Sequence, residues 1–378
     1  MNAVDVTFIV IGLMLATALL APRIPIPAPV VFATVGICVG AGWQFIPALP
    51  LVRMPPDVVL FVLLPPLLTT AAYALPLPAF RRDLVPIALL AVGLTTVTAC
   101  VVAALGHAFA GLGWAAAFVL GAILAPTDPV AATVVAARTG LSHRLVLILE
   151  GEGLVNDAVA IAIYGIALTA LMTGHFDATL ALLELLQQAP LGVAVGLGVG
   201  WAAGQLRKRV ENVPVEIGIS LVTPYLAYHL AERFGGSSVL AVVALGLMLR
   251  SSSAKVSSPV THLASRTVWS FLRFASTGLV FVLLGLLIGE IAATSPDGAV
   301  VRVGLVLGAV AIGLRLVWML ALPRLVSLLG ESSGPIPTFG EKVVLGWAGM
   351  RGVVSLALAL ALPLSLGGEG EFGRRSSR

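Results

Sequence analysis

The amino-acid sequence predicts an all-α polytopic membrane protein with about twelve transmembrane helices. Of its 378 residues, 59% are hydrophobic and 11% are charged, whereas soluble domains contain about 25% charged residues. Apolar runs of about 20 residues, the length of a helix that crosses a bilayer, recur along the chain. A membrane β-barrel would instead show alternating segments of about 10 residues, and the sequence has none of these.

The expected spans are separated by short linkers that contain helix breakers, such as Pro22–Pro27 and Ser332–Pro335. The run 237–250 is short for a full crossing, so it needs residues from its flanks. The spans are expected at residues 5–22, 28–44, 57–75, 84–106, 114–137, 145–173, 179–206, 214–232, 237–250, 267–292, 300–322 and 341–363.

The distribution of basic residues predicts the orientation of these spans. Most Lys and Arg residues fall in one set of alternate loops, whereas the opposite set holds Arg53, Arg233 and Arg302. Cytoplasmic loops carry an excess of Lys and Arg, so the N-terminus is expected outside, in a cell (inner) membrane. The net charge of +4 is explained by these loops, and no nucleic-acid partner is expected.

Residues 1–363 are expected to form a single transmembrane domain, followed by a non-spanning tail at 364–378. The segment Phe61–Leu68 resembles Phe281–Ile288, and an offset of seven spans would turn the two copies in opposite directions across the membrane. Inverted repeats with broken helices at the midplane characterise many membrane folds. The first repeat is expected at about 1–173, a linker helix at about 179–206 and an incomplete second repeat at about 214–363.

The fifth span contains the sequence Pro126-Thr127-Asp128-Pro129. Pro129 lacks a backbone N–H, and the residue before a proline avoids the helical region. We therefore expect two half-helices joined by an unwound segment at Thr127 and Asp128. Free carbonyl groups and helix ends in such a segment can hold a cation, although a proline kink with Asp128 as a helix cap would also fit this pattern.

The sixth span places Glu150, Glu152, Asn156 and Asp157 at membrane depth. Gly153 and Asp157 share a helix face because they are four residues apart, so Gly153 leaves room beside Asp157 for an ion or water. Burial disfavours the charged form of a carboxyl group, so a proton and a cation can compete for it. Ionisable groups at this depth are rare and are functional candidates, although interhelical hydrogen bonding is the simpler alternative.

Three arginines, Arg273, Arg315 and Arg351, also lie within expected spans. A buried arginine needs a partner, and Glu152 and Glu150 are candidates for Arg351. We interpret Arg315 and Arg351 as structural cations, and Arg273 lies near enough to a span end to extend to the interface. The glycines of the seventh span predict a close-packing face rather than a phosphate loop; they are Gly192, Gly196, Gly198, Gly200 and Gly204.

The sequence contains no nucleophilic constellation, metal-ligand set or nucleotide motif, so we expect neither an enzyme nor a bound cofactor. The five histidines are scattered near span ends. Cys38 and Cys100 lie in apolar runs without metal-ligand spacing, and a disulfide framework is not expected.

Three ordered motifs resemble the bacterial Na⁺/H⁺ antiporters of the NhaP-like branch, within the monovalent cation/proton antiporter superfamily. They are Ala125–Ala131, Glu150–Asp157 and Trp347–Gly352, and the similarity extends over nearly the whole chain. The resemblance implies an inverted-repeat secondary transporter with discontinuous helices, thirteen in the family. It also implies a homodimer in which a mobile core domain moves against a dimerisation domain.

The resemblance further implies that Asp157 binds a cation and a proton alternately, with Asn156 beside it. Thr127 and Asp128 would form the crossing of the broken helices, and Na⁺ would be held at Asp157 and by the Thr127 carbonyl. An Asn-Asp pair at this position accompanies electroneutral exchange in the superfamily. The resemblance also implies an ion pair between Glu152 and Arg351.

The chain departs from the family pattern in three places. Relatives often have Ser at the position of Gly153, and some carry Glu at the position of Thr70. The family continues after Leu362-Pro363 into a last core helix, whereas residues 364–378 are too polar to span. The expected function is exchange of Na⁺ or Li⁺ for H⁺. The alternatives are a K⁺/H⁺ antiporter on the same scaffold and a truncated, non-transporting membrane protein.

Overall fold

The structure is a computed structural model that describes residues 3–20, 26, 28–42, 59–128, 141–210, 212–256, 259–293, 298–328, 337–347, 349 and 351–362. Within these ranges every regular element is helical. Other expected features lie outside them, namely Pro129, the second half of the fifth span and the tail at 364–378.

The helices follow the expected spans closely, and two π-helical turns, η3 and η4, interrupt the third and fourth spans. The elements are α1 (Ala3–Leu20), α2 (Ala28–Gly42), η3 (Val59–Leu63), α4 (Leu64–Ala74), α5 (Leu77–Arg82), α6 (Leu84–Ala88), η4 (Leu89–Leu94), α7 (Thr95–Ala110), α8 (Trp114–Leu124), α10 (His143–Thr173), α11 (Ala178–Arg207), α12 (Val213–Arg233), α13 (Ser238–Val256), α14 (Pro259–Ala293), α15 (Gly298–Leu328), α16 (Phe339–Trp347) and α17 (Val353–Leu360).

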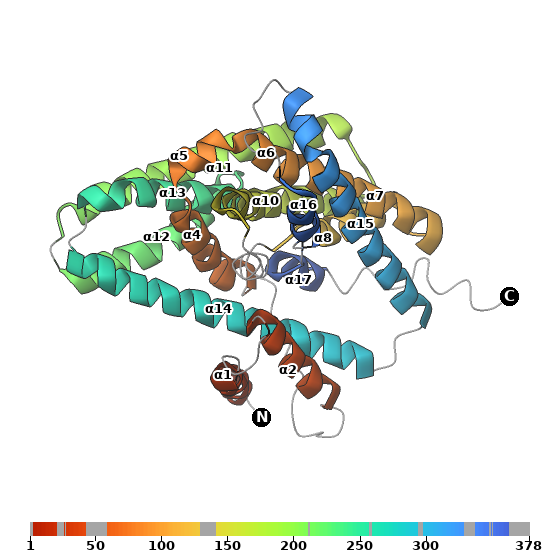
Figure 1. Ribbon diagram of the computed structural model, residues 1–378, viewed down its shortest axis with the longest axis horizontal. Coiled ribbons are helices and arrows are strands. Elements are labelled where there is room, and N and C mark those ends of the chain that lie inside the picture. The colour runs from red at the N-terminus through yellow and green to blue at the C-terminus, as the bar shows by residue number, and fades with distance from the viewer. Residues whose placement is uncertain are drawn as a thin grey trace.

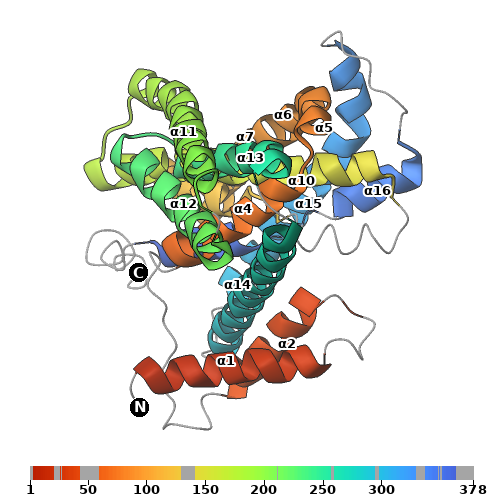
Figure 2. The ribbon, with the colours of Figure 1, turned by 90° about the vertical axis from the view of Figure 1, so that its left-hand side faces the viewer.

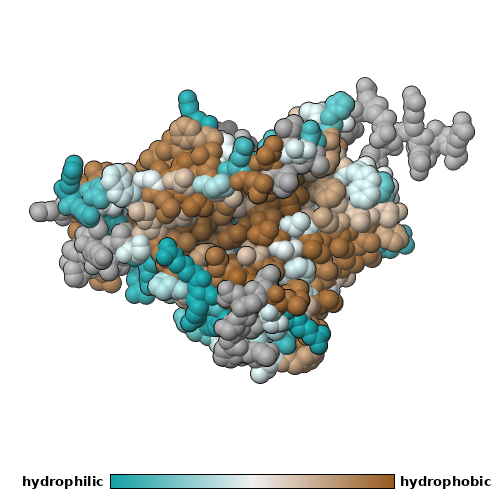
Figure 3. All heavy atoms as spheres, turned by 90° about the horizontal axis from the view of Figure 1, so that it is seen from above, coloured by the Kyte–Doolittle hydropathy of each residue, from teal (hydrophilic) through white to brown (hydrophobic). Residues whose placement is uncertain are grey.

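Five helical stretches among the described residues are long and apolar enough to cross a membrane. They are Leu84–Ala110, His143–Thr173, Leu183–Arg207, Leu263–Ala293 and Val301–Leu328. Large apolar side chains also lie on the outside of the bundle, for example Phe109, which is 78% exposed. Figure 3 shows one such face, where hydrophobic residues cover most of the surface. Such a surface favours contact with lipid rather than water.

Helix α10 lies inside the bundle, and α14 with α2 and α1 forms one side of it. The long helix α14 runs along one side with α2 against it and α1 beyond (Figures 1 and 2). Glycines allow α2 and α14 to approach closely, because a Cβ atom on Gly36 would lie 2.9 Å from the Cα atom of Gly285. Helix α10 lies in the middle of the bundle and contacts α4, α7, α8, α13 and α17.

The glycine face predicted for α11 is confirmed in part. Gly192, Gly196 and Gly200 face α13 or the residue before it, and a Cβ atom on Gly200 would lie 3.3 Å from Leu245. Gly198 and Gly204 face no atom within 4 Å. Gly198 lies half a turn away from the contact because a helix repeats every 3.6 residues.

Two non-helical segments meet near the middle of the bundle. Helix α8 ends at Leu124, and Ala125–Asp128 are not helical, which confirms the break predicted at Thr127 and Asp128. The expected span 341–363 is interrupted, because the chain divides there into α16 and α17, with Gly349, Arg351 and Gly352 outside both helices. Glycine disfavours helix by about 1 kcal/mol relative to alanine, which makes this the weak point of the span.

Candidate functional site

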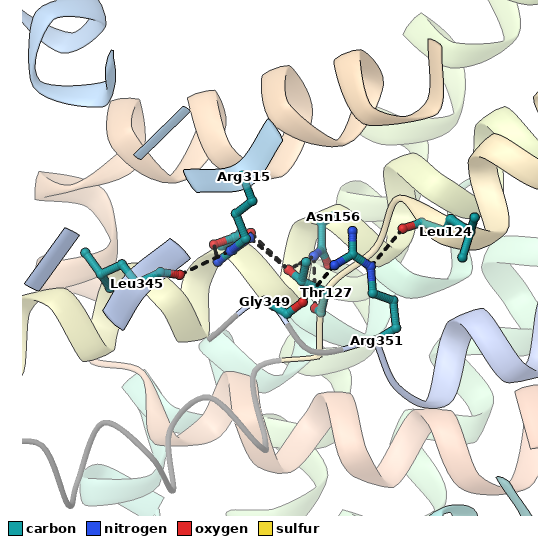
Figure 4. Close-up of polar contacts among 8 residues, drawn as sticks. Leu124, Thr127, Asn156, Arg315, Leu345, Gly349 and Arg351 are labelled. Atoms are coloured by element: carbon teal, nitrogen blue, oxygen red, sulfur yellow. Dashed lines mark hydrogen bonds and ion pairs between the residues drawn. The ribbon is translucent and has the colours of Figure 1, made fainter. Parts of the chain in front are cut away.

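The unwound segment after α8 is fastened to α10 through Thr127 and Asn156. The Asn156 side-chain amide donates to the Thr127 carbonyl at 3.0 Å and to the Thr127 hydroxyl at 2.9 Å. Asn156 is fully buried, and Figure 4 shows it facing Thr127. The Thr127 carbonyl group lies outside any helix and has no intrahelical donor. The hydrogen bond from Asn156 satisfies it and fixes its direction.

Glu152, one turn before Asn156, pairs with Arg315 of α15. Arg315 Nη2 donates to Glu152 Oε2 at 2.9 Å, and Nη1 donates to Glu152 Oε1. Each residue is 2% exposed, and the Thr127 hydroxyl also donates to Glu152 Oε1 at 2.9 Å. The expected ion pair between Glu152 and Arg351 is therefore wrong. Arg315 reaches the carboxylate from a neighbouring helix and fixes its orientation by a two-pronged contact.

Arg351 instead links the C-terminal end of α8 to the segment between α16 and α17. Its Nε donates to the Leu124 carbonyl at the end of α8 at 3.0 Å, and its Nη1 donates to the Gly349 carbonyl at 2.9 Å. Figure 4 shows Arg351 and Arg315 reaching the unwound segment from different sides. The last carbonyl groups of a helix carry partial negative charge, so a guanidinium group there is stabilising.

Asp128 and Asp157 face one small cavity from two different elements. Each is 9% exposed, and both line a space of about 50 Å³ together with Thr127 and Gly153. A space of this size holds one ion or a few water molecules, because one water needs about 10–15 Å³ by this measure. The structure therefore brings together Thr127, Asp128, Gly153 and Asp157 in one cavity.

Two residues of this cavity were missed in the sequence. Gly352 lies directly against Asp128, and a Cβ atom there would overlap the Asp128 carboxyl group. Ser355 of α17 also lines the cavity, and its hydroxyl is buried without a hydrogen-bond partner among the described residues. The Gly349 and Gly352 pair could have indicated a second break, but a lone serine in an apolar span carries no signal.

The secondary candidates Glu150 and Thr70 lie away from this cavity. Neither lines it, and Glu150 is half-buried, within electrostatic range of Arg273. The Thr70 carbonyl accepts a hydrogen bond from Arg273 at 3.1 Å. Arg315, the third secondary candidate, belongs to the site as the partner of Glu152.

The oxygen atoms around the cavity suit a small hard cation. Two carboxylates and the Ser355 hydroxyl line it, and the Thr127 backbone belongs to the same unwound segment. Among the residues that the structure describes, no group of three or more His, Cys, Asp or Glu side chains is arranged to hold a metal ion. Hard cations prefer oxygen ligands, which the carboxylates, the hydroxyl group and the unwound backbone supply here.

The fold and this site define a class of protein, namely a helical membrane protein in which the unwound segment after α8 and the break between α16 and α17 meet beside a pair of buried aspartates. The family description "Sodium/hydrogen exchanger, transmembrane" matches residues 9–370. The chain belongs to this sodium/hydrogen exchanger family, which confirms the resemblance to bacterial Na⁺/H⁺ antiporters.

Two curated relatives are similar over most of the chain. The Na(+)/H(+) antiporter ApNhaP of Aphanothece halophytica is 31% identical over 334 residues, which are 88% of this chain and 63% of ApNhaP. The low-affinity Na(+)/H(+) antiporter NhaS1 of Synechocystis sp. is 32% identical over 375 residues, 95% of this chain and 68% of NhaS1. The chain thus spans about two thirds of the length of these relatives.

A solved structure shares the fold. The sodium proton antiporter MjNhaP1 from Methanocaldococcus jannaschii at pH 8 superimposes with a TM-score of 0.72 and 19% sequence identity. The match covers 95% of this chain and 88% of MjNhaP1. The predicted class of helical transporter fold is therefore confirmed, whereas the division into two repeats stays a prediction.

Proposed function

We propose that the chain is a secondary antiporter that exchanges Na⁺ or Li⁺ for H⁺ across a cell membrane. The observation that carries this proposal is the cavity of about 50 Å³ between Asp128 and Asp157, beside unwound backbone in the bundle interior. The names of ApNhaP and NhaS1 support the same pair of ions.

Competition at Asp157 couples the two ions. An ionised Asp157 in this buried position needs a counter-ion, and either a cation or a proton supplies it. When the proton is bound, the carboxyl group is neutral and one carboxylate ligand of the cation is lost. Alternating access then requires the core helices to move between two arrangements while one ion at a time is held.

Neutral oxygens complete the cation site in this proposal. Gly153 of α10 has no side chain that could bind the cation. The Ser355 hydroxyl of α17, which lines the same cavity, supplies a ligand instead. The Thr127 carbonyl is the second neutral ligand, held in place by Asn156. Thr127 and Asp157 are therefore the central cation ligands, and Asp128 contributes charge.

The proposal includes the membrane location, the oligomeric state and the orientation of the protein. Apolar helices and the family place the chain in a membrane, and we propose a homodimer with its N-terminus outside. The asymmetry of Lys and Arg between alternate loops supports this orientation.

Transport by the purified 378-residue chain in proteoliposomes tests the function. Addition of Na⁺ should drive protons across the vesicle membrane between about pH 6 and about pH 9, with parallel measurements in Li⁺ and K⁺. The Asp157→Asn variant should lose this movement while it keeps its fold. The control variant is Asp177→Asn, which removes an exposed carboxylate before α11.

Each outcome is informative. Activity in Asp177→Asn but not in Asp157→Asn supports exchange centred on Asp157. Equal activity in both variants would place the ion site elsewhere. Proton movement driven by K⁺ alone would identify K⁺, and not Na⁺, as the substrate. No proton movement with any of the three ions would refute transport by this polypeptide.

A further inference from the structure

A second and much larger cavity lies away from the aspartate pair. Its volume is about 720 Å³, and no residue lines both cavities. Helices α2, α4, α11, α12, α13 and α14 form its walls. Four arginines line it, and we call it the arginine cavity; they are Arg207, Arg250, Arg266 and Arg273.

The positive charge of this cavity is only partly balanced. Arg207 donates to Glu216 at 3.1 and 2.7 Å, and Arg273 lies within electrostatic range of Glu150. Arg250 lies over the ring of Tyr73, with its guanidinium carbon 5.8 Å from the ring centroid. That contact is a cation–π interaction, which leaves the charge of Arg250 unneutralised.

Arg266 has neither a hydrogen bond nor an ion pair to any residue that the structure describes. It lies two turns before Arg273 on α14, so the two side chains share one face of that helix. The cavity is therefore lined by two guanidinium groups, those of the exposed residues Arg250 and Arg266, which have no carboxylate partner among the described residues.

The remaining walls combine apolar rings with hydroxyl groups. Phe32 and Phe274 line one part, and Ser265 and Ser270 lie near Arg266 on α14. Trp269 donates from its indole nitrogen to the Ser220 hydroxyl at 3.4 Å. Tryptophan is enriched where a membrane protein meets the interface between lipid and water. The cavity thus offers cationic and hydroxyl donors beside an apolar surface.

We propose that the arginine cavity binds a phosphoryl anion, supplied by the headgroup of an anionic phospholipid or by a soluble phosphate. A guanidinium group presents donors in a fork that matches two phosphate oxygens. Basic pockets between transmembrane helices suit anionic headgroups, and the loop charges predict that this end of the bundle is cytoplasmic. A passage for Na⁺ would not be lined by unbalanced arginines, because they repel cations.

The test measures thermal unfolding of the full chain in nanodiscs of phosphatidylcholine. One series replaces part of this lipid by phosphatidylglycerol, and a second adds inorganic phosphate at constant ionic strength. At least one probe should raise the unfolding temperature in a saturable manner. The Arg266→Gln variant should need about tenfold more of that probe, as expected for loss of one charged hydrogen-bonding group.

Arg233→Gln is the matched control, because Arg233 is exposed at the end of α12 and does not line the cavity. A response to phosphatidylglycerol alone identifies a lipid headgroup, and a response to inorganic phosphate identifies a soluble ligand. Absence of both responses would overturn the proposal. So would an equal response of Arg266→Gln and Arg233→Gln, since it would reflect overall charge and not this cavity.

Discussion

The buried pair of Glu152 and Arg315 should be the most sensitive ionic contact in the site. Both residues are 2% exposed, and two guanidinium nitrogens of Arg315 reach the two carboxylate oxygens. The Thr127 hydroxyl adds a third contact at 2.9 Å. Loss of one partner would leave the other charge buried without compensation.

The Glu152→Gln variant removes the negative charge while it keeps the size of the side chain. We expect a loss of about 3–5 kcal/mol in the free energy of unfolding, the usual cost of a broken buried pair. Arg315→Gln should lose a similar amount. The variant with both changes buries no unpaired charge at this pair, so its loss should be smaller than the sum of the single losses by about 2 kcal/mol.

Unfolding free energies from denaturant titration in detergent micelles, followed by tryptophan fluorescence, measure these losses. A second cycle combines Glu152→Gln with Arg351→Gln, whose guanidinium group donates to backbone carbonyls instead. Coupling in this second cycle should be the smaller of the two. Additive losses for Glu152 and Arg315, or stronger coupling of Glu152 to Arg351, would refute the pairing.

Two predictions concern the cavity beside Asp157. Gly352→Ala should weaken the apparent affinity for Na⁺ in proteoliposomes, because the added Cβ atom displaces the Asp128 carboxyl group. The control is Gly340→Ala, which should not change this affinity, because a Cβ atom on Gly340 would meet no atom within 4 Å. If both variants changed the Na⁺ affinity equally, the idea that Gly352 must be a glycine to leave room for the Asp128 carboxyl group would be refuted. Ser355→Ala should also weaken the affinity for Na⁺, by about tenfold, because a neutral oxygen ligand is lost. An unchanged Na⁺ affinity in a folded Ser355→Ala protein would exclude this hydroxyl from the site.

The sequence carries a strong signal for the unwound segment and the aspartates. A proline after Asp128 disfavours helix at that residue, and carboxylates in an apolar span are conspicuous against their neighbours. Each of these signals is local, because it depends on residues that are adjacent or one helical turn apart. For that reason Thr127, Asp128, Gly153 and Asp157 could each be singled out from the amino-acid sequence, whereas a shared cation site was implied by the family resemblance.

The ion-pair partner of Glu152 could not be predicted from such local signals. Arg315 and Arg351 both lie within apolar spans, and the choice between them depends on how α15 and the segment before α17 are rotated about their axes. Those rotations follow from tertiary packing, for example the contact of Gly346 with Leu316. The arginine cavity has the same origin, since its arginines come from three different helices, α11, α13 and α14.

The charges at the site bear on the stoichiometry of exchange. Asp128, Asp157 and Glu152 supply three carboxylates against the two guanidinium groups of Arg315 and Arg351, which leaves one net negative charge when all are ionised. One Na⁺ or one proton neutralises that charge, so both loaded states should cross the membrane with equal charge. We therefore expect electroneutral exchange, with a rate in proteoliposomes that does not change when a membrane potential is imposed. A rate that increases with a potential of one sign and decreases with the other would show net charge movement and refute this accounting.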